Sequence, residues 1–206
     1  LKGLLTFDFT QGVLRMAKEH GIPAIIDVKD PHVEKYHGAY LLKPNLKEIR
    51  DLTGMPAQSD DEIVEAADKL RTECNCKYVL CTCGARGMVL VGEHTQPFFI
   101  QSQVREVFDV SGAGDTTISY LAAAMANGMD MSDAVTIANY AAGIQVGKIG
   151  TSSVYMQEVR DFLSNEDNGT FHKILHAEDL ETFRQDNADK KIVFTNGCFD
   201  ILHVGP

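Results

Sequence analysis

The chain has 206 residues, of which 44% are hydrophobic and 23% are charged. This composition is typical of a soluble globular protein with room for one or two domains. The formal net charge of −10, with no basic block to offset it, argues against non-specific nucleic-acid binding. No apolar run approaches the ~20 residues of a membrane span, and the N-terminal segment lacks a secretory pattern, so we expect a cytoplasmic protein.

Both ends of the chain lie within apparent structural elements. The chain begins at Leu1, inside an apolar run, and it ends at Pro206, where a new element starts. We therefore expect a fragment of a longer protein.

Short apolar runs alternate with helical patterns in the first part of the chain. Strands are expected at residues 4–8, 23–28 and 39–43, and a helix at residues 11–20. This alternation predicts βαβ units with a parallel sheet, in which ligands gather beyond the carboxyl ends of the strands. Charged residues that follow these strands are either solvated or part of a site, and they are Asp8, Asp27, Lys29 and Lys43.

Asn45 follows the third expected strand and precedes a helix expected over residues 46–52. Its side chain is suited to cap this helix, with Glu48 in the position of a capping box. This structural explanation is complete without any ligand. A helix N-terminus at the end of a strand is also a place where phosphates bind.

The next segment predicts a helix over residues 59–73, capped by Ser59, and a strand over residues 77–82. Thr82, Gly84 and Gly87 form a T-x-G-x-x-G pattern before the apolar residues 88–91. A glycine-rich hairpin turn explains the pattern as well as a ligand-binding loop does. Arg86, inside it, either reaches a phosphate or faces solvent.

The five cysteines include two C-x-C pairs, Cys74 with Cys76 and Cys81 with Cys83; the fifth is Cys198. Thiolates bind zinc, but the spacing differs from the C-x₂-C of common zinc sites. We therefore favour buried free thiols over a metal site.

Residues 97–100 and 106–108 predict further strand pieces, which lead into Asp-Val-Ser-Gly-Ala-Gly-Asp at residues 109–115. An apolar helix follows over residues 117–126, and Gly128 ends it. A sharp turn of small residues before a helix presents unpaired N–H groups to an anion.

The small residues of this turn are Gly112, Ala113 and Gly114, and Asp115 follows them. Asp115 either stabilises the first turn of the helix or acts as a general base. As a base it would take the proton of a substrate hydroxyl during phosphoryl transfer.

A further helix is expected over residues 132–148, capped by Ser132, with Asn139 in its middle. The small residues around Asn139 permit close packing against a neighbour or against a flat base.

The string D-V-S-G-A-G-D-T at residues 109–116 resembles the signature of the ribokinase-like (PfkB) sugar kinases. The resemblance implies a ribokinase-like α/β fold, in which a mostly parallel sheet is flanked by helices. It also implies that Asp115 is the catalytic base and that Gly112, Ala113 and Gly114 surround the transferred phosphoryl group.

The same resemblance extends to other motifs of the chain. It implies that Asn45, Leu46, Lys47 and Glu48, as N-x-x-E, organise Mg²⁺, water and nucleotide phosphate, with Glu48 and Asn45 at the metal through water. It implies that ATP contacts Thr82, Gly84 and Gly87, and that Asn139 lies beside the adenine. Asp27-Val-Lys29 resembles a D-x-K on the substrate side, and residues 147–151 resemble the G-K-x-G-T of the heptose-kinase branch.

From residue 158 the character of the chain changes. Residues 164–169 have the composition of a linker, residues 177–189 predict a connector helix, and residues 191–195 predict a new strand. The following G-x-F-D-x-x-H-x-G resembles nucleotidyltransferases that hold the phosphates of ATP, which implies nucleotide contacts for Gly197, Phe199 and His203. The second histidine of that motif belongs at position 206, where this chain has Pro206.

The order of these motifs resembles the bifunctional heptose 7-phosphate kinases/heptose 1-phosphate adenylyltransferases of lipopolysaccharide core synthesis. We expect the C-terminal part of a kinase domain at residues 1–163, a linker and connector helix at 164–189, and the start of a Rossmann-like nucleotidyltransferase domain at 190–206. The resemblance implies ATP and Mg²⁺ as cofactors, a sugar phosphate as substrate and a homodimer at full length. Without the resemblance, composition and spacing predict only ATP-dependent phosphoryl transfer to an alcohol.

A monofunctional PfkB sugar kinase and a non-catalytic nucleotide-binding relic remain alternatives. We expect the 206 residues by themselves to be inactive as a kinase, because the part that binds the sugar in this family is not among them.

Overall fold

The computed structural model describes residues 5–102, 110–148, 150, 152–167 and 184. The chain divides into two compact units, Leu1–Phe162 and Leu163–Pro206, and the sheet lies wholly in the first. The elements are α1 (Phe7–Glu19), β1 (Ile25–Asp27), the 3₁₀ turn η1 (Val33–Tyr36), β2 (Leu41–Lys43), α2 (Leu46–Thr53), α3 (Asp60–Glu73), β3 (Tyr78–Thr82), the 3₁₀ turn η2 (Gly84–Arg86), β4 (Met88–Gly92), β5 (Phe98–Ile100), α4 (Ala113–Ala126), α5 (Met131–Val146) and α6 (Met156–Asp167).

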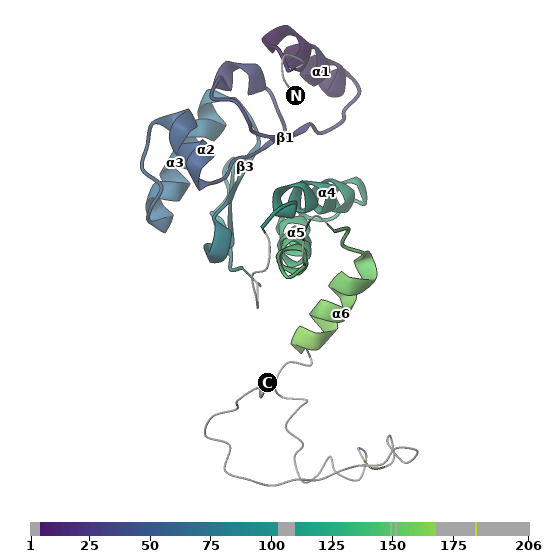
Figure 1. The fold of residues 1–206 in the computed structure, drawn as a ribbon. Coiled ribbons are helices and arrows are strands. Elements are labelled where there is room, and N and C mark those ends of the chain that lie inside the picture. The colour runs from purple at the N-terminus through teal and green to yellow at the C-terminus, as the bar shows by residue number, and fades with distance from the viewer. Residues whose placement is uncertain (1–4, 103–109, 149, 151, 168–183, 185–206) are drawn as a thin grey trace. The chain divides into compact units, whose positions relative to one another are not determined.

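The sheet has the order β1-β2-β3-β4-β5 (Figure 1). Its first three strands are parallel, with Ile25 opposite Leu41 and Leu41 opposite Tyr78, and β4 and β5 continue it in antiparallel fashion. The expected α/β architecture with a mostly parallel sheet is confirmed. Since β1, β2 and β3 point the same way, their carboxyl ends share one edge.

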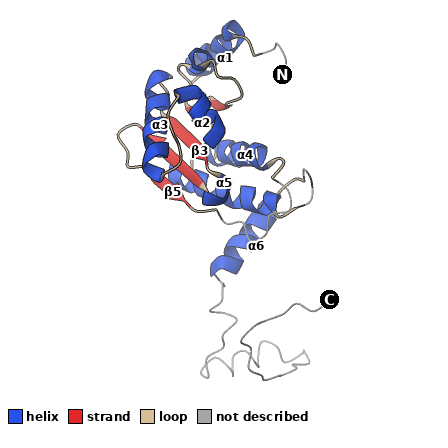
Figure 2. Ribbon diagram, turned by 60° about the vertical axis from the view of Figure 1, so that its left-hand side comes forward, coloured by secondary structure: helices blue, strands red, loops and turns tan. Residues whose placement is uncertain are grey.

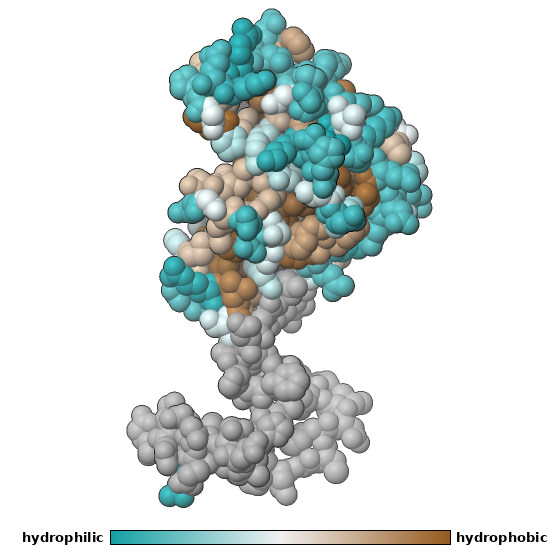
Figure 3. Space-filling model, turned by 180° about the vertical axis from the view of Figure 1, so that it is seen from behind, coloured by the Kyte–Doolittle hydropathy of each residue, from teal (hydrophilic) through white to brown (hydrophobic). Residues whose placement is uncertain are grey.

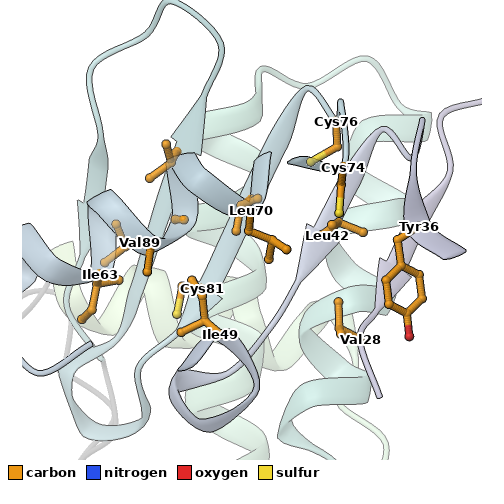
Figure 4. Close-up of a cluster of buried hydrophobic side chains, with 14 of the residues drawn as sticks. Val28, Tyr36, Leu42, Ile49, Ile63, Leu70, Cys74, Cys76, Cys81 and Val89 are labelled. Carbon is orange, nitrogen blue, oxygen red and sulfur yellow. The ribbon is translucent and has the colours of Figure 1, made fainter. Parts of the chain in front are cut away.

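Helices cover both faces of this sheet (Figures 1 and 2). On one face α2 and α3 bury Ile49, Ile63 and Leu70 against alternate strand residues, including Leu42 and Val79 (Figure 4). On the other face α4 and α5 bury an apolar cluster that comprises Leu41, Leu80, Leu90, Leu121, Val135 and Ala138. β2, β4 and most of β3 are thus buried on both sides, which explains why these strands are continuous apolar runs rather than alternating ones, whereas the edge strands β1 and β5 are partly exposed.

The strand expected at residues 4–8 is wrong for its described part. Thr6 instead caps α1, because its hydroxyl accepts the N–H of Phe9 at 3.3 Å, and Asp8 lies in the first helical turn. The helix therefore begins at Phe7 and not at residue 11, whereas its end before Gly21, at φ +66°, agrees with the expectation. The two leucines before the N-cap Thr6 form too short an apolar run to predict a strand.

α1 buries few of its apolar side chains. Leu14 is buried, but Phe7, Phe9, Val13 and Met16 are 47–63% exposed. Hydrophobic surface is also visible on the face drawn in Figure 3, among hydrophilic side chains.

The two helices on the second face differ in detail from the expectation. α4 begins at Ala113, so Asp115 lies inside its first turn, and Gly128 follows its end with φ +75°. α5 begins after Asp130 rather than Ser132, and Ser132 is an internal residue whose carbonyl accepts the hydroxyl of Thr136 at 2.7 Å. It ends at Val146, two residues before the expected Lys148.

The other expected elements of the first 100 residues are confirmed within a residue or two. Both predicted caps are present as capping boxes, Asn45 with Glu48 on α2 and Ser59 with Glu62 on α3. α6 extends to Asp167, so the first residues of the expected linker are helical. The strand pieces at 106–108 and 191–195 and the connector helix at 177–189 lie outside the described residues, apart from Arg184, which is helical.

Among the helices that the structure describes, none combines the length and the apolarity that crossing a bilayer demands.

Two glycines of the β3–β4 connection test how tightly this turn packs. Gly87 has φ +96°, and a Cβ placed there would overlap the carbonyl oxygen of Ile100, whereas Gly84, with φ +60°, has open space around its Cβ position. We expect Gly87→Ala to unfold at much lower urea concentration than the wild type. Gly84→Ala should cost only the ~1–2 kcal/mol of a left-handed residue. Equal urea midpoints for the two variants would contradict this packing.

Candidate active site at the carboxyl ends of the parallel strands

The turn before α4 has the geometry of an anion site. Gly112 adopts φ +81°, a left-handed conformation that favours glycine, and it is the N-cap without a side-chain capping bond. The N–H groups of Gly114 and Asp115 belong to the first turn of a 14-residue helix, where donors have no acceptor within the helix. The side chain of Asp115 is exposed beside them. Donors for an anion and a carboxylate that can take a proton therefore stand together.

Two buried side chains hold this turn in place. Thr117, 1% exposed, donates its hydroxyl to the carbonyl of Ala113 at 2.8 Å. Gln145 of α5, also 1% exposed, donates its side-chain amide to the carbonyls of Ser111 at 3.3 Å and Gly150 at 3.1 Å. Sequence reasoning missed Gln145, although an amide within the otherwise apolar residues 140–146 was a signal for such a role.

Four charged side chains meet where β1 and β2 end. Asp27 lies between two lysines, with Oδ1 2.7 Å from Nζ of Lys43 and Oδ2 3.0 Å from Nζ of Lys29. Lys29 also lies 3.4 Å from Oε1 of Glu48. Burial alone would lower the pKa of Lys29, but the hydrogen bond and charge of Asp27, together with Glu48, raise it above the ordinary value.

The four charges differ in exposure. The side chain of Lys29 is 55% exposed, as a solvated loop charge would be, but that of Lys43 is only 4% exposed. Asp8, the remaining charge expected at a strand end, lies instead on α1.

The capping box of α2 uses most of the polar atoms of its two residues. Oδ1 of Asn45 accepts the N–H groups of Lys47 at 2.9 Å and Glu48 at 2.8 Å, while Oε2 of Glu48 accepts the N–H of Asn45 at 2.7 Å. Oδ1 of Asn45 is thereby occupied by two backbone N–H groups. Oε1 of Glu48 accepts only a long hydrogen bond from Nζ of Lys29, at 3.4 Å.

The T-x-G-x-x-G segment lies directly beside this box. Thr82 pairs with Asn45 across the strand ends, and its N–H donates to the carbonyl of Pro44 at 3.0 Å. Arg86 points elsewhere: its guanidinium donates to the carbonyl of Gln58 at 2.6 Å and lies 3.6 Å from Asp60. The two motifs thus meet at one sheet edge without Arg86.

Asn139 is 3% exposed within α5 and donates its amide to the carbonyl of Gln101 at 2.9 Å. This bond ties α5 to the chain after β5 and explains the residue structurally, as the packing interpretation expected. Of the other predicted site residues, Gly197, Phe199 and His203 lie outside the described residues.

Comparison with known proteins places these motifs in context. The pfkB family of carbohydrate kinases matches residues 8–158. "Bifunctional protein HldE" of Vibrio parahaemolyticus is 40% identical over 201 residues, which cover 97% of this chain and 42% of that protein. The protein of the same name from Stutzerimonas stutzeri is 41% identical over 197 residues, or 95% of this chain and 41% of that protein. The chain therefore spans less than half the length of these curated relatives.

Among solved structures, Arabidopsis thaliana ribokinase complexed with ribose and ATP is similar with a TM-score of 0.72 and 28% sequence identity. The similarity covers 77% of this chain and 53% of the ribokinase chain. The expected ribokinase-like fold is confirmed.

The four described cysteines are free and buried in the core between the sheet and α3 (Figure 4). Within the described ranges no group of three or more His, Cys, Asp or Glu side chains could hold a metal ion. Burial raises the pKa of Cys74 to about 11 and that of Cys76 to about 12. The hydrogen bond between Cys81 and Cys83 raises the pKa of Cys81 further and lowers that of Cys83.

These thiols make the free-cysteine interpretation testable. At pH 8 a thiol of pKa about 11 is almost wholly protonated, and only the thiolate reacts. We expect iodoacetamide at pH 8 to leave Cys74 and Cys76 unmodified in the folded chain and to label them fully in urea, as peptide mass spectrometry would show. Stoichiometric zinc, released as the cysteines become reactive, would contradict the interpretation.

Proposed function

Because the chain belongs to the pfkB family of carbohydrate kinases, we propose that Asp115 is the general base of ATP-dependent phosphoryl transfer to a sugar hydroxyl. The observation that carries the proposal is its place in the first turn of α4, where it is exposed and follows the left-handed Gly112, and where the N–H groups of Gly114 and Asp115 have no acceptor within the helix. The sugar oxygen would form a bond to the γ-phosphorus, the bond from that phosphorus to the β–γ bridging oxygen would break, and the hydroxyl proton would pass to Asp115.

The base and the backbone donors would stabilise different charges in the transition state. A positioned base contributes about 10²–10⁴-fold to the rate, because it removes the proton as the oxygen attacks. The N–H groups of Gly114 and Asp115 would donate to the charge that spreads over the phosphoryl oxygens, and each well-placed donor is worth about 3–4 kcal/mol. The N–H of Ala113 already donates to the carbonyl of Val110 at 3.3 Å, so Gly112 and Ala113 contribute the shape of the turn. Thr117 and Gln145 support the turn, so its donors need little rearrangement when the substrate arrives.

Glu48 is the better of the two proposed magnesium residues. Its Oε1 has only the long contact to Lys29 at 3.4 Å, while the oxygen of Asn45 already accepts two backbone N–H groups. Mg²⁺ keeps most of its waters and needs few carboxylates, so one oxygen at the sheet edge fits it. When bound there, the ion would neutralise charge on the phosphates of ATP.

The nucleotide would lie along the same edge. Thr82 adjoins the capping box of α2, and Gly84 and Gly87 shape the turn that follows. The ribokinase that resembles this chain was solved with ATP, which supports a nucleotide site in this fold. Leu46 and Lys47 contribute through the first turn of α2, and Asn139 through the packing of α5.

We further propose heptose 7-phosphate as the sugar, phosphorylated at C1, and adenylyl transfer to heptose 1-phosphate as a second activity of the complete protein. Support comes from the names of the curated relatives, which are bifunctional, and from the motif of Gly197, Phe199 and His203. The kinase part would then comprise residues 1–163, in accord with the family match to 8–158. Residues 164–189 would connect it to a nucleotidyltransferase domain that begins at residue 190.

The base is tested by Asp115→Asn in the complete protein. We expect kcat for phosphorylation of heptose 7-phosphate to fall about 10²–10⁴-fold, measured as sugar-dependent ADP release. Asp133→Asn is the matched control, since Asp133 is an exposed aspartate in the first turn of the neighbouring α5. A near wild-type rate in Asp115→Asn would show that another group takes the proton.

The magnesium role is tested by Glu48→Gln against Glu62→Gln. Both residues occupy the same position of a capping box, and glutamine preserves such a box, so neither change should alter the helix much. We expect only Glu48→Gln to raise the half-saturating Mg²⁺ concentration of the kinase, by about 10-fold or more. Equal Mg²⁺ dependence of the two variants would remove Glu48 from the metal site.

A further inference from the structure

Lys43 is a buried cation for which the residues that the structure describes provide no hydrogen-bond acceptor. Its side chain is 4% exposed, and its Nζ lies 2.7 Å from Oδ1 of Asp27. That contact has the distance of an ion pair but not the angles of a hydrogen bond, because Oδ1 of Asp27 has no hydrogen-bond partner. An ammonium carries three N–H donors. In the described part of the chain, no hydrogen-bond acceptor is found for any of them.

The ammonium lies against the turn before α4. A Cβ placed on Gly114 would be 3.4 Å from Nζ of Lys43, an approach that the missing side chain of glycine makes easy. The N-terminus of a helix carries partial positive charge, so a cation at this end is unfavourable unless an anion accompanies it. Asp27 offsets part of this charge, but it is shared with Lys29.

We propose that Lys43 is a further catalytic residue of the kinase and donates to an oxygen of the transferred phosphoryl group. This inference rests on the proposed function, which places that group at the turn of Gly112 to Gly114. An anion at the turn would satisfy the free donors of Lys43 and of the first helical turn together. During transfer Lys43 keeps its proton, since the proton of the sugar hydroxyl passes to Asp115.

A second buried lysine of the chain shows what a purely structural pair looks like. Lys35, with a side chain 11% exposed, forms a hydrogen bond of 2.7 Å to Oδ2 of Asp30. It has a hydrogen-bonded acceptor and lies within η1, which is not part of the turn before α4. Lys43 has a carboxylate oxygen at the same distance, yet no hydrogen bond joins Oδ1 of Asp27 to it.

The experiment compares Lys43→Met with Lys35→Met in the complete protein. Each change removes one buried ammonium from one aspartate, but only the first removes charge from the proposed phosphoryl site. We expect Lys43→Met to lower kcat about 10²-fold, with little change in the KM for sugar. Lys35→Met should keep kcat within about threefold of the wild type, even where it lowers thermal stability.

A second measurement isolates the transferred group. ADP with aluminium fluoride mimics the phosphoryl group in transit, whereas ADP alone does not. We expect Lys43→Met to lose the extra inhibition that aluminium fluoride gives the wild type, while inhibition by ADP alone is retained. If Lys43→Met does not fold, Lys43→Gln takes its place, because its amide can still meet Asp27 without a charge.

The outcomes separate this inference from the function on which it rests. A kcat for Lys43→Met or Lys43→Gln close to that of Lys35→Met, with inhibition by aluminium fluoride intact, would overturn the role of Lys43 and leave Asp115 as the base. A near wild-type rate in Asp115→Asn would overturn the proposed base whatever Lys43 does.

Discussion

The parallel pairing of β1, β2 and β3 determines where the polar groups of this protein gather. Because the three strands run the same way and helices cover both faces of the sheet, the chain can place charged side chains only where the strands end. Asp27, Lys43 and Thr82 are the last residues of these strands, and Asn45 follows two positions after β2. β4 runs antiparallel to β3, and β5, which is antiparallel to β4, runs again in the direction of β1, β2 and β3, so its last residue Ile100 lies at the same edge. The turn before α4 lies at this edge as well, because a Cβ placed on Gly114 would be 3.4 Å from Nζ of Lys43.

At this edge the same atoms serve stability and chemistry. The capping box of Asn45 and Glu48 stabilises α2 by about 1 kcal/mol in a typical case, and in doing so it orients the carboxylate oxygen Oε1 that we propose for a metal-bound water. The identical box of Ser59 and Glu62 on α3 lies at no such strand end. A capping pattern is therefore no evidence for function in itself. Its position at the end of a parallel strand distinguishes the two.

Most helices, strands and caps of this structure were predictable from the sequence, and the predictions that failed did so for physical reasons. Apolar runs, caps and glycine stops identified the helices and strands around the two capping boxes because those signals are local. The strand expected at residues 4–8 failed because the cap offered by Thr6 outweighed two apolar residues before it. Ser132 and Asp130 are both good caps two residues apart, and the sequence alone could not rank them. The burial of Lys43 and the hydrogen bond from Gln145 to the carbonyl of Ser111 depend on contacts between segments that are distant in the chain. No local sequence pattern indicates such contacts.

The site residues likewise fall into two groups: those that the sequence indicates and those that only the tertiary structure reveals. Glycines, aspartate and the N-x-x-E motif stand out in the sequence because their conformational and chemical properties are unusual wherever they occur. A lysine at the end of a strand is ordinary in sequence, and solvation is its usual fate. Burial changes what such a lysine means. Removing an ammonium from water is costly, and an ion pair without a hydrogen bond recovers little of that cost, so a chain selected for stability alone would favour an apolar side chain at position 43. The free-energy cost of burying this ammonium has a function if an anionic substrate binds beside it. In that case the protein keeps positive charge preorganised beside the helix terminus, and the negative partner is the substrate itself.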